Sequence, residues 1–281
     1  MLFDDQKYVF YDGAMGTMLQ QRGLKPGEKP DLMNITDPGA VEEVHRLYVE
    51  AGSDIITTNT FGSNADALKS TGYTPVEIIT AAVSIAKKAS EGRAKVALDI
   101  GPTGQMMEPF GDLTPEKAYE LFKEQAVAGE LAGADFATIE TMSDIEELRA
   151  VMTAVAENTK LPMLVTMTFD KNSRTFMGCT TEQFIKTAEE LGASAVGFNC
   201  SLEPSEMFET AKRIADVTTL PLIIKPNAGL PDGESGEYHT GAEDFAAQML
   251  RFKDLGVKII GGCCGTTPEH IKKLKEVYSN Q

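Results

Sequence analysis

One stretch decides the fold: KVALDIGPTGQMMEPFGDLTPEKAYELFKEQAVAGELAGADFATIET, residues 95–141. It begins and ends with short β-rich runs, and an amphipathic segment lies between them. The first run is almost continuously apolar, which is typical of a parallel strand buried on both faces. The amphipathic segment begins at Thr114-Pro115-Glu116, where a Thr N-cap precedes a Pro at the first helical position. The stretch therefore predicts a parallel βαβ unit.

The same alternation extends over the rest of the chain. Each β-rich run is followed by a turn signal and a helix-like segment: YVFYDG (8–13), DIITTNT (54–60), KVALDIG (95–101), DFATIET (135–141), MLVTMTF (163–169), AVGFNC (195–200), LIIKPN (222–227) and KIIGG (258–262). Several helix-like segments end in a Gly, which suits the left-handed position that closes a helix. Eight such units favour a closed barrel over an open sheet. We therefore expect an α/β fold, a single (β/α)8 TIM barrel, undivided over residues 1–281.

Composition narrows the class of protein. With 42% hydrophobic and 24% charged residues, the 281-residue chain is typical of a globular protein with a sizeable core. No run approaches the about 18 apolar residues of a membrane helix, and MLFDDQKYVF lacks the apolar centre of a signal peptide. The formal charge of −16 repels phosphate backbones. We expect a cytoplasmic protein that binds neither nucleic acid nor membranes and, without a visible oligomerisation arm, a monomer.

Three of the four cysteines stand where predicted strands end. Cys200 ends the sixth run, and Cys263 and Cys264 follow the eighth. In α/β barrels the loops after the strands carry the chemistry, so the three thiols should meet on one face. Three thiolates make a soft site that suits Zn²⁺ and leaves a fourth tetrahedral position open, as in catalytic zinc sites. Cys179 is expected to stay free, because a fourth protein thiolate would close the metal site.

The adjacency of Cys263 and Cys264 requires an explanation, because successive residues of a regular strand point to opposite faces. Gly261 and Gly262 precede the pair and Gly265 follows it, so the backbone can leave strand geometry there. We therefore interpret GGCCG as a metal-binding segment rather than as a pair of inert core cysteines.

Two other kinds of site remain open from the residues alone. NAG (227–229) and GGCCGTT (261–267) match the Gly-rich loops with which barrels bind phosphate, although neither contains a basic residue. Lys225, at the end of the seventh run, could form a Schiff base in a metal-free, aldolase-type enzyme. The competing interpretation of Lys225, which we prefer, is an ion pair inside the barrel mouth.

Seven motifs follow one another along nearly the whole chain: DGAMGT (12–17), TNTFGSN (58–64), DIGPTG (99–104), IETMSD (139–144), VGFNCS (196–201), KPNAGLP (225–231) and GGCCGTTPEHI (261–271). With them the sequence resembles the homocysteine S-methyltransferase family, most closely its branch of homocysteine-binding modules of cobalamin-dependent methionine synthases. Seven matches in the same order are not expected by chance. The resemblance implies that residues 1–281 form a homocysteine-binding barrel domain.

The resemblance implies zinc-dependent methyl transfer. In that family the Cys of GxNC and both Cys of GGCC bind zinc, which assigns Cys200, Cys263 and Cys264 as metal ligands and catalytic residues. The thiol of homocysteine would fill the open position as a thiolate and attack an activated methyl group, giving methionine. An alkyl thiol with a pKa of about 8.5 is only slightly ionised at neutral pH, so the metal would supply the nucleophile.

The resemblance also implies a site for the amino-acid end of the substrate. Asp12 and Glu140, at the ends of the first and fourth runs, resemble the family's ammonium-binding acids. Gly13 and its neighbours offer backbone N–H groups for the carboxylate. Phe61 and Asn199 are expected to form a wall of the site or to support it.

The methyl donor must come from outside the predicted barrel. The likeness to the corrinoid-dependent branch favours methylcobalamin or a separate methylated corrinoid protein, supplied in trans. S-methylmethionine or a betaine-like donor, and another small thiol or selenol as acceptor, would use the same zinc–thiolate chemistry and stay open.

Overall fold

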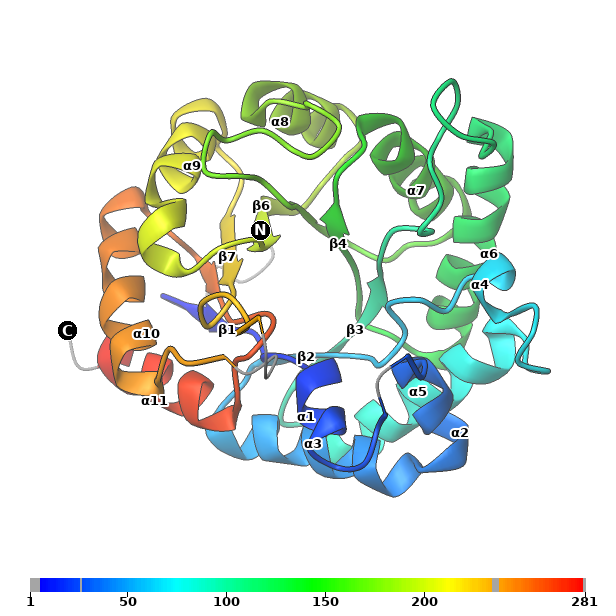
Figure 1. The fold of residues 1–281 in the computed structure, drawn as a ribbon, viewed down its shortest axis with the longest axis horizontal. Helices are drawn as coiled ribbons and strands as arrows, with labels where there is room; N and C mark the ends of the chain where they lie inside the picture. The colour runs from blue at the N-terminus through cyan, green and yellow to red at the C-terminus, as the bar shows by residue number, and fades with distance from the viewer. Residues whose placement is uncertain (1–5, 26, 234–237, 280–281) are drawn as a thin grey trace.

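The computed structural model describes residues 6–25, 27–233 and 238–279. Eight parallel strands form a barrel at the centre of the molecule, and helices surround it (Figure 1). The strands are β1 Val9–Phe10, β2 Ile55–Thr57, β3 Lys95–Ile100, β4 Phe136–Met142, β5 Met163–Met167, β6 Ala195–Cys200, β7 Leu222–Pro226 and β8 Ile259–Ile260. Seven lie within a predicted β-rich run and β4 extends one residue beyond its run, to Met142, so the predicted (β/α)8 barrel is confirmed.

Neighbouring strands follow the order β1-β8-β7-β6-β5-β4-β3-β2. The gap between β1 and β2 is closed by a single parallel bridge between Tyr11 and Ile55. The Asp12 N–H donates to the Ile55 carbonyl at 3.0 Å, and the Asp54 N–H donates to the Phe10 carbonyl at 2.7 Å. The sheet therefore closes into a barrel, although β1 and β2 are hydrogen-bonded over only a short length.

The outer ring consists of α3 Pro38–Ala51, α5 Pro75–Ser90, α6 Pro115–Ala132, α7 Ile145–Asn158, α8 Thr181–Glu190, α9 Pro204–Val217, α10 Ala242–Met249 and α11 Pro268–Ser279. Shorter helices are α1 Gly16–Gln20, α2 Met33–Thr36 and α4 Ala65–Leu68, with 3₁₀ turns at Pro30–Leu32 and Leu250–Leu255. The Thr114 side chain accepts from the Lys117 N–H at the start of α6, and Gly133 closes that helix at φ 96°. The helix start predicted at Thr114-Pro115 is confirmed, and the helix ends in a Gly, as several helix-like segments were expected to do.

The barrel interior changes from apolar to polar along its axis. Side chains that face the interior alternate along each strand. One cluster of such side chains is apolar: Val9, Tyr11, Ile55, Ala97, Phe136, Leu164, Ala195, Ile223 and Ile259. Two or four residues further along, buried polar side chains follow: Thr57, Asp99, Thr138, Glu140, Thr166, Asn199 and Lys225. These seven side chains, together with the Tyr11 hydroxyl, form the polar layer at the carboxyl ends of the strands.

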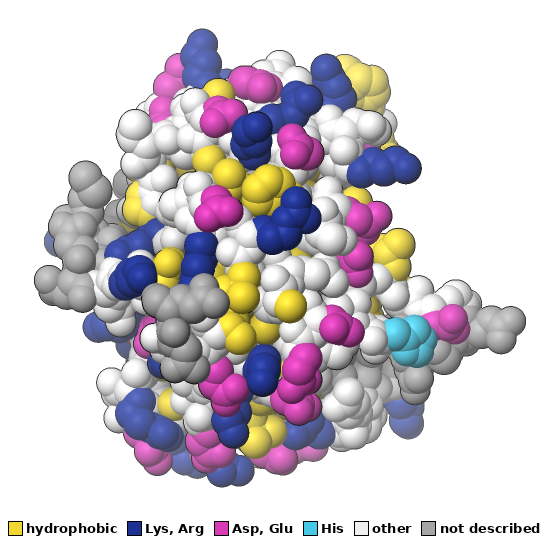
Figure 2. All heavy atoms as spheres, turned by 90° about the vertical axis from the view of Figure 1, so that its left-hand side faces the viewer, with side chains coloured by type: hydrophobic (Ala, Val, Ile, Leu, Met, Phe, Trp, Pro, Cys, Tyr) yellow, Lys and Arg dark blue, Asp and Glu magenta, His cyan; other side chains and the backbone are white. Residues whose placement is uncertain are grey.

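The face that contains α10 and α11 carries acidic and basic side chains side by side, with small apolar groups between them (Figure 2). Salt bridges such as Lys273–Glu243, at 3.5 Å, join neighbouring helices there. Within the described residues, no helix is both long and apolar enough to span a membrane.

Candidate metal centre

The sulfur atoms of Cys200, Cys263 and Cys264 all lie within 4.8 Å of one another at the mouth of the barrel. The Cys200 and Cys264 sulfurs are 3.9 Å apart. Zinc–sulfur bonds of about 2.3 Å at tetrahedral angles would separate two thiolates by about 3.8 Å. The spacing and the donor set of the cluster therefore fit a zinc ion.

Cys200 enters the cluster through an unusual backbone turn. Cys200 and Ser201 have φ values of 60° and 68°, which side chains other than Gly rarely adopt. Such conformations cost on the order of 1 kcal/mol or more and persist where the surroundings hold them. The Ser201 hydroxyl accepts from the Phe169 N–H at 3.1 Å, and the Ser201 carbonyl accepts from the Asn227 amide at 3.0 Å. The loops after β5 and β7 thus hold the backbone turn that places Cys200 in the cluster.

The glycines around Cys263 and Cys264 have two different functions. Gly265 has a φ of +79°, so it gives the conformational freedom expected from the sequence. A Cβ on Gly261 would lie 2.6 Å from the Tyr11 Cβ, and one on Gly262 would lie 2.4 Å from the Thr266 hydroxyl. Neither Gly261 nor Gly262 is at positive φ. Their lack of a side chain lets the backbone pack closely against Tyr11 and Thr266. It does not serve a left-handed backbone conformation.

Hydrogen bonds attach the Cys263–Cys264 turn to the loop after β7. The Cys263 N–H donates to the Pro226 carbonyl at 2.9 Å, and the Ala228 N–H donates to the Cys264 carbonyl at 3.0 Å. The chain therefore brings the two sulfurs toward Cys200 on the adjacent β6, whose last residue is paired with Pro226.

The thiols of the cluster resist ionisation unless a cation compensates their charge. The pKa of Cys200 rises to about 12: a hydrogen bond with Cys263 lowers it, but one with Cys264 and burial raise it by more. A hydrogen bond with Cys200 lowers the pKa of Cys264, but contacts with Cys263 and burial together raise it by more, to about 12. A coordinated divalent cation would supply the missing positive charge.

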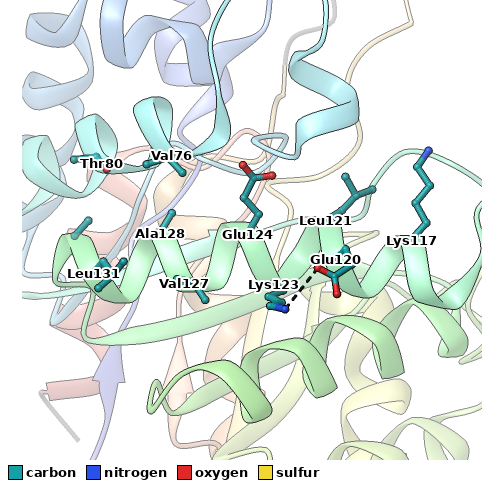
Figure 3. A pocket seen from close by; sticks show the side chains of 11 residues that line it. Val76, Thr80, Lys117, Glu120, Leu121, Lys123, Glu124, Val127, Ala128 and Leu131 are labelled. Atoms are coloured by element: carbon teal, nitrogen blue, oxygen red, sulfur yellow. Dashed lines mark ion pairs between the residues drawn. The ribbon is translucent and has the colours of Figure 1, made fainter.

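A pocket of about 630 Å³ opens above the three cysteines. Its size is typical of a small-molecule site, and Asp12, Glu140 and Lys225 line it together with the cysteines. A second hollow of about 620 Å³ lies between α5 and α6, lined by Val76, Leu131 and charged side chains of α6 (Figure 3). That hollow is on the outer ring and contains no cysteine or histidine. The mouth pocket is therefore the candidate active site.

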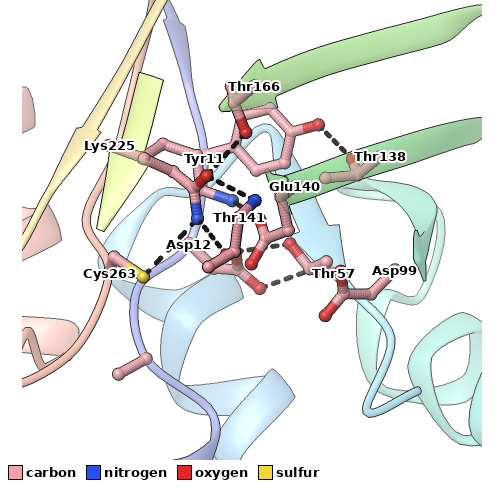
Figure 4. A network of polar contacts seen from close by, with 12 residues as sticks. Tyr11, Asp12, Thr57, Asp99, Thr138, Glu140, Thr141, Thr166, Lys225 and Cys263 are labelled. Carbon is pink, nitrogen blue, oxygen red and sulfur yellow. Dashed lines mark hydrogen bonds and ion pairs between the residues drawn. The ribbon is translucent and has the colours of Figure 1, made fainter. Parts of the chain in front are cut away.

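A buried ion pair crosses the polar layer (Figure 4). The Lys225 ammonium lies 2.6 Å from a Glu140 carboxylate oxygen, with the two side chains 5% and 11% exposed. The ammonium also lies 4.4 Å from the centre of the Tyr11 ring. Burial lowers the pKa of Lys225, but Glu140, Tyr11 and Asp12 raise it by more, so Lys225 stays charged. A charged ammonium is a poor Schiff-base nucleophile, which disfavours the aldolase-type alternative.

Asp12 is buried beside β2. Its carboxylate accepts from the Thr57 N–H at 2.7 Å and from the Thr57 hydroxyl at 2.8 Å. Burial is the largest cause that raises the pKa of Asp12 to about 7, against the lowering effects of Lys225 and Thr57. The next residue, Gly13, also lines the pocket, and a Cβ there would lie 2.5 Å from the Thr266 hydroxyl.

Asn199 and Phe61 occupy different positions in the site. Asn199 is fully buried, and its side chain accepts from the Thr141 N–H at 2.7 Å and from the Thr166 hydroxyl at 2.8 Å. Its amide lies 3.8 Å from the Cys263 sulfur. Asn199 therefore braces the end of β4 beside the cysteines, whereas Phe61 is 41% exposed and lines the pocket.

Two further features, Tyr238 and a pair of unpartnered side-chain oxygens, had no strong signal in the sequence, whereas Cys179 was expected to stay free of the metal site. Tyr238 lines the pocket beside Cys264, and burial together with Cys264 raises its pKa. The Oδ1 atom of Asn227 and the Oδ1 atom of Asp99 are buried without a hydrogen-bond partner among the described residues. Cys179 is buried outside the cluster, and its thiol donates to the Thr180 carbonyl at 3.4 Å.

Comparisons with known proteins identify the family. The sequence model of the homocysteine S-methyltransferase family matches residues 9–278. Methionine synthase of Mycobacterium leprae (strain TN) is 29% identical over 296 residues, covering 96% of this chain and 24% of the relative. Methionine synthase of Mycobacterium tuberculosis (strain ATCC 25618 / H37Rv) is 28% identical over 305 residues, covering 98% and 25%. The chain thus spans about a quarter of the length of these curated relatives.

Solved structures share the fold. The metallated form of the homocysteine methyltransferase MmuM from Escherichia coli superimposes with a TM-score of 0.85 at 23% identity, over 98% of each chain. The apo form of the same protein gives a TM-score of 0.76 at 22% identity. Because the family match extends from β1 into α11, the chain belongs to the homocysteine S-methyltransferase family.

Proposed function

We propose that this protein methylates the thiol of homocysteine, giving methionine, with a zinc ion held by Cys200, Cys263 and Cys264. The observation that carries the proposal is the group of three sulfurs within 4.8 Å of one another beside a pocket of ligand size. When bound, zinc would hold the substrate sulfur as a thiolate at a pH where the free thiol is mostly protonated. Membership of the family supports homocysteine as the acceptor.

The chain's own residues would orient the amino-acid end of the substrate. Asp12 and Glu140 place carboxylates in the pocket wall, suited to an ammonium group, and Gly13 lines the pocket beside Asp12. The charge on Lys225 compensates part of the negative charge that these acids gather. In this proposal Asn199 supports the cysteines without touching the substrate, and Phe61 forms a wall.

For the methyl donor we propose methylcobalamin or a methylated corrinoid protein supplied in trans. The support is the motif likeness to the corrinoid-dependent branch and the similarity to two methionine synthases. S-methylmethionine is the alternative donor. It is small enough that a pocket of about 630 Å³ could hold it together with a bound thiol.

The test combines metal analysis with a methyl-transfer assay on the wild type, Cys263→Ala and a matched control, Cys179→Ala. Homocysteine is offered with methylcobalamin, a methylated corrinoid protein or S-methylmethionine in separate reactions. We expect one zinc per chain and methionine formation for the wild type and C179A, and loss of both for C263A. Full zinc content and full rate in C263A would refute the proposed metal site. Turnover with S-methylmethionine alone would refute the proposed donor.

A further inference from the structure

The polar layer at the barrel mouth is almost fully paired. Buried hydroxyl, amide, carboxylate and ammonium groups contact one another between neighbouring strands and across the barrel, as Figure 4 shows for Tyr11 with Thr138 and for Asp12 with Thr57. The pairs are Tyr11 with Thr138 at 2.6 Å, Asp12 with Thr57 at 2.8 Å, Thr166 with Asn199 at 2.8 Å, and Lys225 with Glu140 at 2.6 Å. Such pairing is expected where polar groups are removed from water.

Asp99, on β3, is the exception. Its side chain is 7% exposed and lines the mouth pocket, yet its Oδ1 atom has no hydrogen-bond partner among the described residues. Its backbone is held on both sides, because its N–H donates to the Thr58 hydroxyl at 3.0 Å and its carbonyl accepts from the Thr60 hydroxyl at 2.7 Å. A buried carboxyl oxygen held in this way is costly unless a donor reaches it.

Four charged groups act on Asp99 inside the pocket. Burial is the largest cause that raises the pKa of Asp99 well above its ordinary range, and Glu140, Asp31 and Asp12 raise it further. Lys225 lowers the pKa of Asp99 by less than these groups raise it. The pocket wall therefore gathers four buried acids around a single buried ammonium, an arrangement that favours a second positive charge.

We propose that Asp99 binds the ammonium group of the thiol substrate. Glu140 accepts from Lys225 and Asp12 accepts twice from Thr57, whereas the Asp99 oxygen has no donor within the part of the chain that the structure describes, so Asp99 would join Asp12 and Glu140 in binding the ammonium. Asp99 would then make the site selective for thiols that carry an α-ammonium group. This inference rests on the proposed function and adds a specificity-determining residue to it.

The test compares homocysteine with 4-mercaptobutanoate, the same thiol acid without the amino group. Dissociation constants are measured by calorimetry on the zinc-loaded wild type, Asp99→Asn and Asp99→Ser. The matched control is Glu147→Gln, a buried acid outside the pocket lining whose carboxylate accepts from the Thr103 N–H at 2.8 Å and the Thr103 hydroxyl at 2.6 Å. Steady-state kinetics with methylcobalamin add KM and kcat, and metal analysis checks the zinc content.

We expect the Asp99 variants to bind homocysteine about tenfold to hundredfold more weakly, because a hydrogen bond to a charged group is lost. Binding of 4-mercaptobutanoate, kcat and zinc content should stay close to wild type, and E147Q should keep the wild-type ratio of the two dissociation constants. If the wild type methylates homocysteine but D99N and D99S keep its ratio of the dissociation constants of the two thiols, the role of Asp99 is overturned and the proposed function stands. A zinc-loaded wild type that binds no homocysteine overturns the proposed function and this inference together.

Discussion

The buried pair of Lys225 and Glu140 offers a quantitative test of the polar layer. Lys225→Met keeps an unbranched side chain, one atom shorter than lysine, and removes its charge. The ammonium lies 2.6 Å from the carboxylate, and both side chains are nearly inaccessible to water, at 5% and 11% exposed. Removing one partner of such a pair leaves a buried charge uncompensated, which typically costs about 3–5 kcal/mol. We expect a loss of this size in the free energy of unfolding, measured in urea at pH 7.

The double variant K225M/E140Q should recover most of that loss, because Glu140 is then no longer a charged group that has lost its partner. In the double-mutant cycle, the coupling free energy should reach about 2 kcal/mol or more. Lys88→Met is the control, since its partner Glu42 lies at a similar 2.7 Å but the lysine is 72% exposed. That variant should cost no more than about 1 kcal/mol. Additive effects of K225M and E140Q, or a K225M loss as small as that of K88M, would refute the reasoning.

Two further predictions concern stability and the metal loop. His45 is fully buried, neither ring nitrogen has a partner among the described residues, and burial lowers its pKa to about 4. The unfolded chain takes up the proton first, so this contribution to the free energy of unfolding should fall by about 1.6 kcal/mol from pH 6.5 to 5. His45→Leu should flatten that dependence in urea titrations, and an unchanged slope would contradict the assignment. In Gly265→Ala, the new Cβ would lie 2.2 Å from the Tyr238 ring at a φ of +79°, so zinc affinity should fall at least about tenfold in competition with a chelator. Gly92→Ala, at φ +75° with open space around it, should lose about 1 kcal/mol of stability and keep its zinc; equal zinc affinity in both variants would argue against a role of the loop geometry.

The barrel was predictable because parallel strands buried on both faces leave near-continuous apolar runs in the sequence. The lengths of the strands were less predictable. The first run was expected over 8–13, but β1 covers only Val9–Phe10, and the eighth run contains only Ile259–Ile260. At both places the chain leaves the sheet to build the pocket, since Asp12 and Cys263 contribute to the site. Apolar composition indicates where a strand passes through the core, but not where its backbone turns away.

The convergence of the three cysteines was also predictable, because the ends of barrel strands meet on one face. The close packing of Gly261 against Tyr11 was not predictable, since it depends on a residue 250 positions away in the chain. The same holds for Asp99. Its Oδ1 atom lacks a hydrogen-bond partner among the described residues, and this can be recognised only when the partners of the other polar side chains in the layer are known. The positive φ of Cys200 likewise follows from contacts with two other loops.

Zinc K-edge X-ray absorption of the zinc-loaded protein tests the central claim most directly. The proposal predicts one zinc per chain with three sulfur scatterers at about 2.3 Å and one lighter atom. On addition of homocysteine, the number of sulfur scatterers should rise from three to four. Fewer than three sulfur scatterers without substrate, or no change when homocysteine is added, would contradict a catalytic zinc held by Cys200, Cys263 and Cys264.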